Sequence, residues 1–249
     1  MGSWGKLNFA QKTCVSSAGK LMHQTGMITD GTRVGVALSG GVDSWVLLKV
    51  LTIRKMILPF RIELMVLHVN PGFDPNFHRP LADWVERNGL ASHFEISDHG
   101  PRAHSKENRK NSPCFFCCRR RRKRLFELCR KYGLTHLAFG HNTDDLAATF
   151  FMNLFQAGKV QGMSISDDFF QGGLKVVRPL LWLDKSMLVK AARAWELPVL
   201  ENPCPSAADS KRSEIMDWLG RKWKREGRTR RNVFNALRRM ALDEALKKV

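Results

Sequence analysis

A glycine- and hydroxyl-rich segment, residues 39–44, has the composition of a phosphate-binding loop. It reads Ser-Gly-Gly-Val-Asp-Ser and lies between a short apolar run and a segment with helical spacing. Glycines let the backbone turn tightly around an anion, and the N–H groups and dipole at a helix start attract phosphate. Ser39 and Ser44 add hydroxyl donors, whereas Asp43 repels phosphate unless a cation intervenes, so we expect Asp43 to hold Mg²⁺. The segment fits neither the Walker loop nor the dinucleotide-binding glycine pattern.

A second polar segment, residues 140–145, also follows an apolar run and reads Gly-His-Asn-Thr-Asp-Asp. In an open α/β sheet, ligands bind at the carboxyl ends of the strands, so we expect this segment beside the first one. Adjacent acids also suit the first turn of any helix, so Asp144 and Asp145 alone fit a structural role as well as a catalytic one.

Three of the six cysteines have the spacing of a metal centre. Cys114 and Cys117 form a CxxC pair, and Cys204 lies between two prolines. Thiolates three residues apart can bind one metal centre, and three cysteines without a fourth partner indicate an iron–sulfur cluster with an open iron. Zinc stays an alternative if His104 or Cys118 supplies the fourth ligand.

The remaining cysteines, and the absence of an N-terminal export signal, favour a reducing compartment. Cys14 and Cys129 fall at helical spacing among apolar residues, which predicts small core side chains. No N-terminal apolar signal and no run of membrane-spanning length is present, so we expect a cytoplasmic protein without a disulfide framework.

Positive charge dominates the chain and is clustered. Lys and Arg number 41 against 23 acidic residues, a net charge of +18. Residues 102–131 and 211–249 are rich in Lys and Arg, and residues 119–124 are six consecutive basic residues. Such charge favours a polyanionic partner, in the first place nucleic acid. Six consecutive charges cannot share one helix face, so we expect some near the cysteines, with Lys123 as the candidate active-site cation.

Apolar runs alternate with helical segments along the chain. Strands are expected at residues 33–38, 62–69, 92–96, 136–141 and 174–180, and residues 97–113 read as a long mobile loop. This alternation predicts an α/β fold with an open parallel sheet of about five strands, helices on both faces, and helical additions at both ends.

The order of these features resembles one family. The phosphate-loop motif SGGxDS is the signature of the PP-loop ATP pyrophosphatases, which cleave ATP between its α and β phosphates. Together with PCxxC, a basic helix, GHNxDD, RPL and ENPC, it makes residues 5 to 240 similar to the tRNA 2-thiocytidine synthetase group. That resemblance implies ATP, Mg²⁺, a [4Fe-4S] cluster, tRNA as substrate, a sulfur donor that delivers sulfide or a cysteine persulfide, and often a homodimer.

The resemblance also assigns residues. It implies a nucleotide site of Leu38, Ser39, Gly40, Gly41, Asp43, Ser44, Val69, Gly140 and His141, cluster ligands Cys114, Cys117 and Cys204, and catalytic roles for Asp43, Lys123, Asp144 and Asp145. It divides the chain into an N-terminal helical segment (1–28), a PP-loop ATP-binding catalytic domain (29–205) with a CxxC insertion loop (97–118), and basic C-terminal helices (206–249).

This chain departs from the family pattern at three places. Val42 replaces the usual lysine of the phosphate loop, Cys204 lies in an unusual Cys-Pro-Ser-Ala context, and His141 is followed by Asn142 rather than a second histidine. Two other functions remain open at this point: a PP-loop tRNA ligase of the lysidine synthetase kind, which would lack the CxxC pair, and a non-enzymatic zinc protein that binds RNA.

Overall fold

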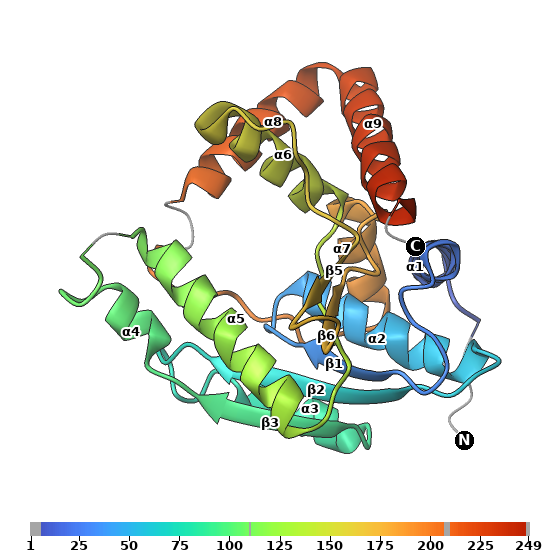
Figure 1. Ribbon diagram of the computed structural model, residues 1–249, viewed down its shortest axis with the longest axis vertical. Coiled ribbons are helices and arrows are strands. Elements are labelled where there is room, and N and C mark those ends of the chain that lie inside the picture. The colour runs from blue at the N-terminus through green and yellow to red at the C-terminus, as the bar shows by residue number, and fades with distance from the viewer. Residues whose placement is uncertain (1–5, 110, 207–209, 248–249) are drawn as a thin grey trace.

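One six-stranded sheet forms the centre of the protein (Figure 1). The computed structural model describes residues 6–109, 111–206 and 210–247. The strands are β1 (Arg33–Ala37), β2 (Glu63–Asn70), β3 (Ala91–Ile96), β4 (His136–Ala138), β5 (Ser166–Phe169) and β6 (Leu174–Val177). Their order across the sheet is β3-β2-β1-β4-β6-β5. All five expected strands are therefore present, although β4 and β6 end three residues earlier than the apolar runs indicated.

The chain reverses its direction of travel across the sheet between β1 and β4. Strands β1 to β3 extend to one side, and the chain then returns to place β4 parallel to β1 on the other side. This reversal makes the β1–β4 boundary a topological switch point, where the two following loops diverge and leave room for a ligand.

Strand β5 was not expected from the sequence. It pairs antiparallel with β6 at the sheet edge, and only one of its four residues, Phe169, is a typical strand residue. The hairpin turn places Phe170 and Gln171 at φ values of 55° and 56°, a left-handed conformation that is unusual for residues other than glycine. Polar composition and an unfavourable turn sequence hid this strand, because β5 is held by its partner rather than by its own propensity.

Apolar residues alternate between two cores on opposite faces of the sheet. On β2, Leu64 and Val66 belong to the larger core, whereas Leu67 and Val69 belong to the smaller one. Side chains of a strand point alternately to the two faces, so a strand with apolar residues on both faces requires cover on both. Helix α5 (Pro113–Lys131) covers the smaller core through Leu125, Leu128 and Cys129, and the larger core takes residues from most of the other helices.

The helices that pack on the larger core include the first and the last helix of the chain, α1 and α9 (Figure 1). They are α1 (Phe9–Thr25), α2 (Val42–Ile57), α3 (Arg79–Arg87), α6 (Thr143–Ala157), α7 (Lys185–Ala194), α8 (Lys211–Arg225) and α9 (Gly227–Leu246). The break that separates α8 from α9 falls at Glu226. No helix among the described residues is long and apolar enough to cross a membrane.

The segment expected as a loop before the cysteines is partly helical. It contains the short helix α4 (His99–Ala103), so the expectation of one continuous mobile loop over 97–113 was wrong. Packing accounts for the difference, because Gly100 and Ala103 are buried and the Gly100 N–H donates to the carbonyl of Pro71. Ser112 then caps α5 by accepting a hydrogen bond from the Phe115 N–H, and Pro113 occupies the first turn.

Candidate active site

The predicted phosphate-binding segment forms a tight loop between β1 and α2. Gly40 has a φ of 88°, which a residue with a Cβ rarely adopts, and Gly41 is the N-cap of α2 without a side-chain hydrogen bond to the helix. The Ser44 hydroxyl donates to the Gly41 carbonyl at 2.8 Å and accepts from the Ser39 N–H at 3.1 Å. The loop is therefore fixed from within, while the N–H groups at the start of α2 are left for an anion.

The two predicted segments pack directly against each other across the switch point. A Cβ atom on Gly140 would lie 2.8 Å from the carbonyl carbon and oxygen of Asp43 and 3.0 Å from the Ser44 nitrogen. Only glycine permits this approach, so the end of β4 and the start of α2 form one site. At the start of α6, Asn142 and Asp145 make a reciprocal capping box, which confirms the structural role of Asp145 as a helix-start residue.

Asp43 is held by a lysine that the sequence analysis did not single out. The Lys185 Nζ, at the start of α7, lies 2.7 Å from Asp43 Oδ2, and the Lys185 N–H donates to Asp144 Oδ2 at 2.8 Å. Asp43 Oδ1 is buried and has no hydrogen-bond partner among the described residues. Burial raises the pKa of Asp43, with a smaller contribution from Asp145, and Lys185 opposes it. This unpaired oxygen beside a second carboxylate is a suitable ligand for Mg²⁺, which takes one or two protein carboxylates together with phosphate oxygens.

Three arginines from the C-terminal helices reach the same edge. Arg212 of α8 pairs with Asp145 at 2.6 Å, and Arg230 of α9 lies 3.4 Å from both Asp144 and Asp184. Arg238 of α9 pairs with Asp184 at 2.5 Å. None of these arginines was predicted. The charge clustering in 211–249 pointed to the helices, but a count of charges does not say which ones face the site.

The predicted cysteine ligands come together from two segments. Cys114 and Cys117 lie in the first turns of α5, and the Cys114 Sγ is 3.6 Å from the Ser206 carbonyl, two residues after Cys204. Burial raises the pKa of the Cys114 and Cys117 thiols, and electrostatic repulsion from Cys204 adds to the shift in both. All three thiols are partly buried, whereas Cys118 is exposed.

The surroundings of these cysteines show how the candidate ligands lie. No group of three His, Cys, Asp or Glu side chains in the described part of the chain is arranged to hold one metal ion. His104, the candidate fourth zinc ligand, has its Nε2 4.0 Å from the Cys204 Sγ. Cys14 and Cys129 are buried core residues, as predicted.

The remaining predicted residues lie at different distances from the site. Leu38 is buried, and its carbonyl oxygen is 2.7 Å from His68 Nδ1. Val69 is buried in the smaller core, one residue before the end of β2. His141 is partly buried beside Asp145. Loss of solvation lowers the pKa of His141 to about 4, and the charge of Asp145 opposes that shift. The His141 Nδ1 has no hydrogen-bond partner among the described residues.

The structure does not bring Lys123 to the site. Its side chain is 72% exposed and its Nζ lies 4.0 Å from Glu127 Oε1. Arg121, two residues earlier and partly buried, lowers the pKa of Cys117 against the effect of burial. The basic run therefore does bring a charge near the cysteines, but it is that of Arg121 and not that of Lys123.

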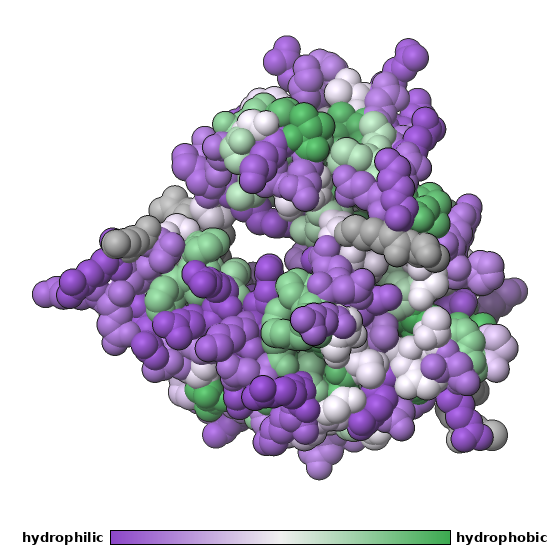
Figure 2. Space-filling view, viewed as in Figure 1, coloured by the Kyte–Doolittle hydropathy of each residue, from purple (hydrophilic) through white to green (hydrophobic). Residues whose placement is uncertain are grey.

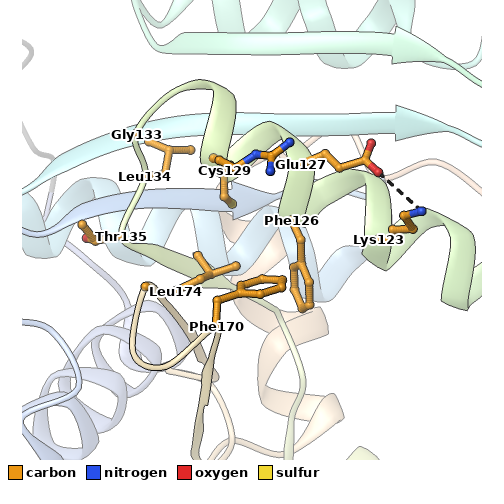
Figure 3. A pocket seen from close by; sticks show the side chains of 11 residues that line it. Lys123, Phe126, Glu127, Cys129, Gly133, Leu134, Thr135, Phe170 and Leu174 are labelled. Carbon is orange, nitrogen blue, oxygen red and sulfur yellow. Dashed lines mark ion pairs between the residues drawn. The ribbon is translucent and has the colours of Figure 1, made fainter.

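An apolar hollow of about 810 Å³ lies between the second half of α5 and the β5–β6 hairpin. Figure 3 shows Phe126, Leu134, Phe170 and Leu174 among the residues that line it. Thr135 and Leu174 adjoin the amino ends of β4 and β6, whereas the phosphate loop follows the carboxyl end of β1. The hollow is therefore separate from the predicted phosphate-binding site.

Comparison with known proteins shows which family the chain resembles. The model of the PP-loop domain matches residues 11–219. A tRNA-cytidine(32) 2-sulfurtransferase of Geobacter sulfurreducens is 30% identical, covering 92% of this chain and 90% of that protein. The enzyme of the same name from Bordetella pertussis is 35% identical over 86% of this chain and 67% of its own length.

The chain belongs to the PP-loop family of tRNA-cytidine(32) 2-sulfurtransferases.

A solved structure supports the fold of this PP-loop sulfurtransferase. The U34-tRNA thiolase NcsA from Methanococcus maripaludis, a protein with a [4Fe-4S] cluster, superimposes with a TM-score of 0.74 at 22% identity. The match covers 93% of this chain and 80% of that one. An NH3-dependent NAD synthetase from Campylobacter jejuni has a TM-score of 0.52 at 16% identity.

The close contact at Gly140 predicts that one added methyl group at this position disturbs the phosphate loop. In a Gly140→Ala variant the new Cβ meets backbone atoms of Asp43 that cannot rotate away, so the phosphate loop must shift. We expect the affinity for Mg-ATP, measured by titration calorimetry, to fall by about tenfold or more. Gly220→Ala in α8 is the control, because no atom lies within 4 Å of its added Cβ. Equal ATP affinity in the two variants would contradict the predicted contact.

The buried His68 predicts a pH dependence of stability. Burial lowers the pKa of His68 to about 4, so between that value and about 6.5 the unfolded chain binds more protons than the folded one. Its contribution is therefore complete above about pH 6.5 and is lost as the pH falls toward 4. Comparing urea unfolding at pH 7 and pH 5, we expect the loss of stability to be smaller in His68→Gln by about 1–2 kcal/mol. His136 and His141 shift in the same direction, so some loss remains in the variant. Identical losses in both proteins would show that His68 is charged in the fold.

Proposed function

We propose that the protein uses Mg-ATP to activate cytidine 32 of tRNA and replaces the oxygen on C2 of that base with sulfur. The observation that carries the proposal is a hydrogen bond between the two halves of the site. The Leu200 N–H donates to the Gly40 carbonyl at 3.0 Å, so the segment that leads to Cys204 starts on the phosphate loop. A nucleotide-binding loop and a cysteine centre are thereby held together, as two-stage chemistry on one base requires.

The first stage is adenylation of the base. The O2 atom of cytosine attacks the α-phosphate of ATP, a P–O bond to the β-phosphate breaks, and pyrophosphate leaves. The start of α2 would bind phosphate oxygens, and Asp43 with Asp144 or Asp145 would hold Mg²⁺. Lys185 would then offset the negative charge that gathers on the α-phosphate, because its Nζ already lies beside Asp43.

The second stage is attack by sulfur at C2, with AMP as the leaving group. Cys114, Cys117 and Cys204 would hold a [4Fe-4S] cluster, which supplies an iron without a protein ligand where sulfide can bind. The protein's own part is to place the activated base next to these cysteines. A donor that delivers sulfide completes the stoichiometry. A cysteine persulfide, such as the product of a cysteine desulfurase, would also need two electrons from a thiol reductant to release its outer sulfur onto the base.

The basic surface would bind the RNA. Figure 2 shows mainly hydrophilic residues on one face and an opening between the part that carries α5 and the part that carries α6 and α8. All five arginines of residues 119–124 are on α5. Base-specific chemistry on RNA takes place on single-stranded loops whose bases can be turned outward, and position 32 is in the anticodon loop.

The proposed reaction is tested on transcribed tRNA under anaerobic conditions. With ATP, Mg²⁺ and sulfide, we expect one 2-thiocytidine per tRNA at position 32, accompanied by one AMP and one pyrophosphate, with no product when position 32 is uridine. Mass spectrometry of the digested RNA measures this. In a parallel reaction with free lysine added, a lysine adduct in place of sulfur would identify a ligase instead.

The three cysteines have separate roles from their neighbour Cys118. Serine replacements at Cys114, Cys117 or Cys204 should each remove the brown cluster absorption of anaerobically prepared protein and abolish thiolation, while ATP still binds. Cys118→Ser is the matched control, because Cys118 is on the same helix and exposed. A colourless wild-type protein with one zinc per chain would contradict the cluster assignment.

A further inference from the structure

The C-terminal helices supply cations to the acids of the nucleotide site. Arg212 of α8 is 38% exposed and pairs with Asp145, which is 19% exposed, at 2.6 Å. Arg230 of α9 lies 3.4 Å from Asp144 and 3.4 Å from Asp184. These two arginines thus neutralise the carboxylates at the start of α6 that Mg²⁺ would need.

The arginines are one contact away from the phosphate loop. Asp145 raises the pKa of Asp43 through its charge, so the two carboxylates lie in the same local field. Asp144 accepts from the Lys185 N–H, and the Lys185 Nζ pairs with Asp43. A polyphosphate bound at the start of α2 would therefore lie near the guanidinium groups that now rest on the acids.

We propose that Arg212 and Arg230 bind the polyphosphate of ATP, exchanging from carboxylates onto phosphate oxygens as Mg²⁺ takes the acids. The inference rests on the proposed use of Mg-ATP. It makes α8 and α9 part of the nucleotide site, in addition to any contact they make with RNA. Guanidinium groups match phosphate geometry and stay charged at every relevant pH, so an exchange between carboxylate and phosphate requires no proton transfer.

The present contacts permit such an exchange at low cost. Asp145 caps α6 through Oδ2, which accepts from the Asn142 N–H at 2.9 Å, whereas Arg212 uses Oδ1. The departure of Arg212 therefore leaves the helix cap intact. The Arg230 distances of 3.4 Å exceed the 2.7–2.9 Å usual for strong charge-assisted bonds, so Arg230 is loosely shared between two carboxylates. Both guanidinium groups remain open to solvent from which a ligand arrives.

Arg238 provides a control on the same helix as Arg230. It donates to Asp184 and to the Thr143 hydroxyl, at 2.5 and 3.0 Å. Among the described residues it makes no ion pair with Asp144 or Asp145. Its role is to hold α9 against the starts of α6 and α7. Its loss should lower thermal stability, but the phosphates should still find their partners.

The test is equilibrium binding of Mg-ATP to the full-length protein, with thermal unfolding recorded on the same samples. We expect Arg212→Gln to raise the dissociation constant by about 10- to 100-fold, the range for a lost hydrogen bond to a charged group. Arg230→Gln should act in the same direction. Arg212→Lys should recover part of the affinity, because the charge is kept and the planar fork is lost. Arg238→Gln should change the dissociation constant less than about threefold while it lowers the melting temperature.

Two results would overturn the inference. Wild-type affinity in Arg212→Gln would show that this arginine only pairs with Asp145. Equal loss of affinity in Arg212→Gln and Arg238→Gln would show that both act by docking the helices. A wild-type protein that binds Mg-ATP with these arginines but forms no 2-thiocytidine would refute the proposed function and leave the inference standing; one that binds no ATP would refute both.

Discussion

The architecture depends on the contact of two strand-to-helix turns at the centre of one sheet edge. Gly140 lies against the backbone of Asp43 with no space for a side chain, and this approach brings the starts of α2 and α6 together. Both helix dipoles then point their positive ends at the same place. The switch of strand order between β1 and β4 leaves room for a ligand at this edge.

Charge balance follows from that approach. Three carboxylates at neighbouring helix starts, those of Asp43, Asp144 and Asp145, repel one another unless cations lie among them. The fold supplies Lys185 from α7 and arginines from the two terminal helices. The site is thus assembled from the phosphate loop, the middle of the chain and its C-terminal part. Ion pairs as well as apolar packing hold these parts together. A substrate that brings both Mg²⁺ and phosphates replaces each side of these ion pairs with a group of the same sign.

Local patterns predicted the elements and motifs, and tertiary pairing decided the rest. The five expected strands, both site loops and the core positions of Cys14 and Cys129 follow from apolar periodicity and from the glycine and acid positions. Strand β5 could not be found, because its residues are mostly polar and its partner strand holds it. The prediction for Lys123 failed because a run of six charges does not reveal which side chains face the cysteines, and Lys123 points to solvent. Lys185 was missed because its partner Asp43 is 142 positions away in the chain.

The central claim is that ATP activates the base oxygen itself, and the fate of that oxygen tests it most directly. A synthetic anticodon stem-loop carries oxygen-18 on C2 of cytidine 32 and is thiolated anaerobically with ATP, Mg²⁺ and sulfide. Because O2 attacks the α-phosphate and later leaves with it, the account predicts one oxygen-18 atom in each AMP formed, as detected by mass spectrometry. Oxygen-18 in pyrophosphate or in water, with unlabelled AMP, would contradict adenylation of the base.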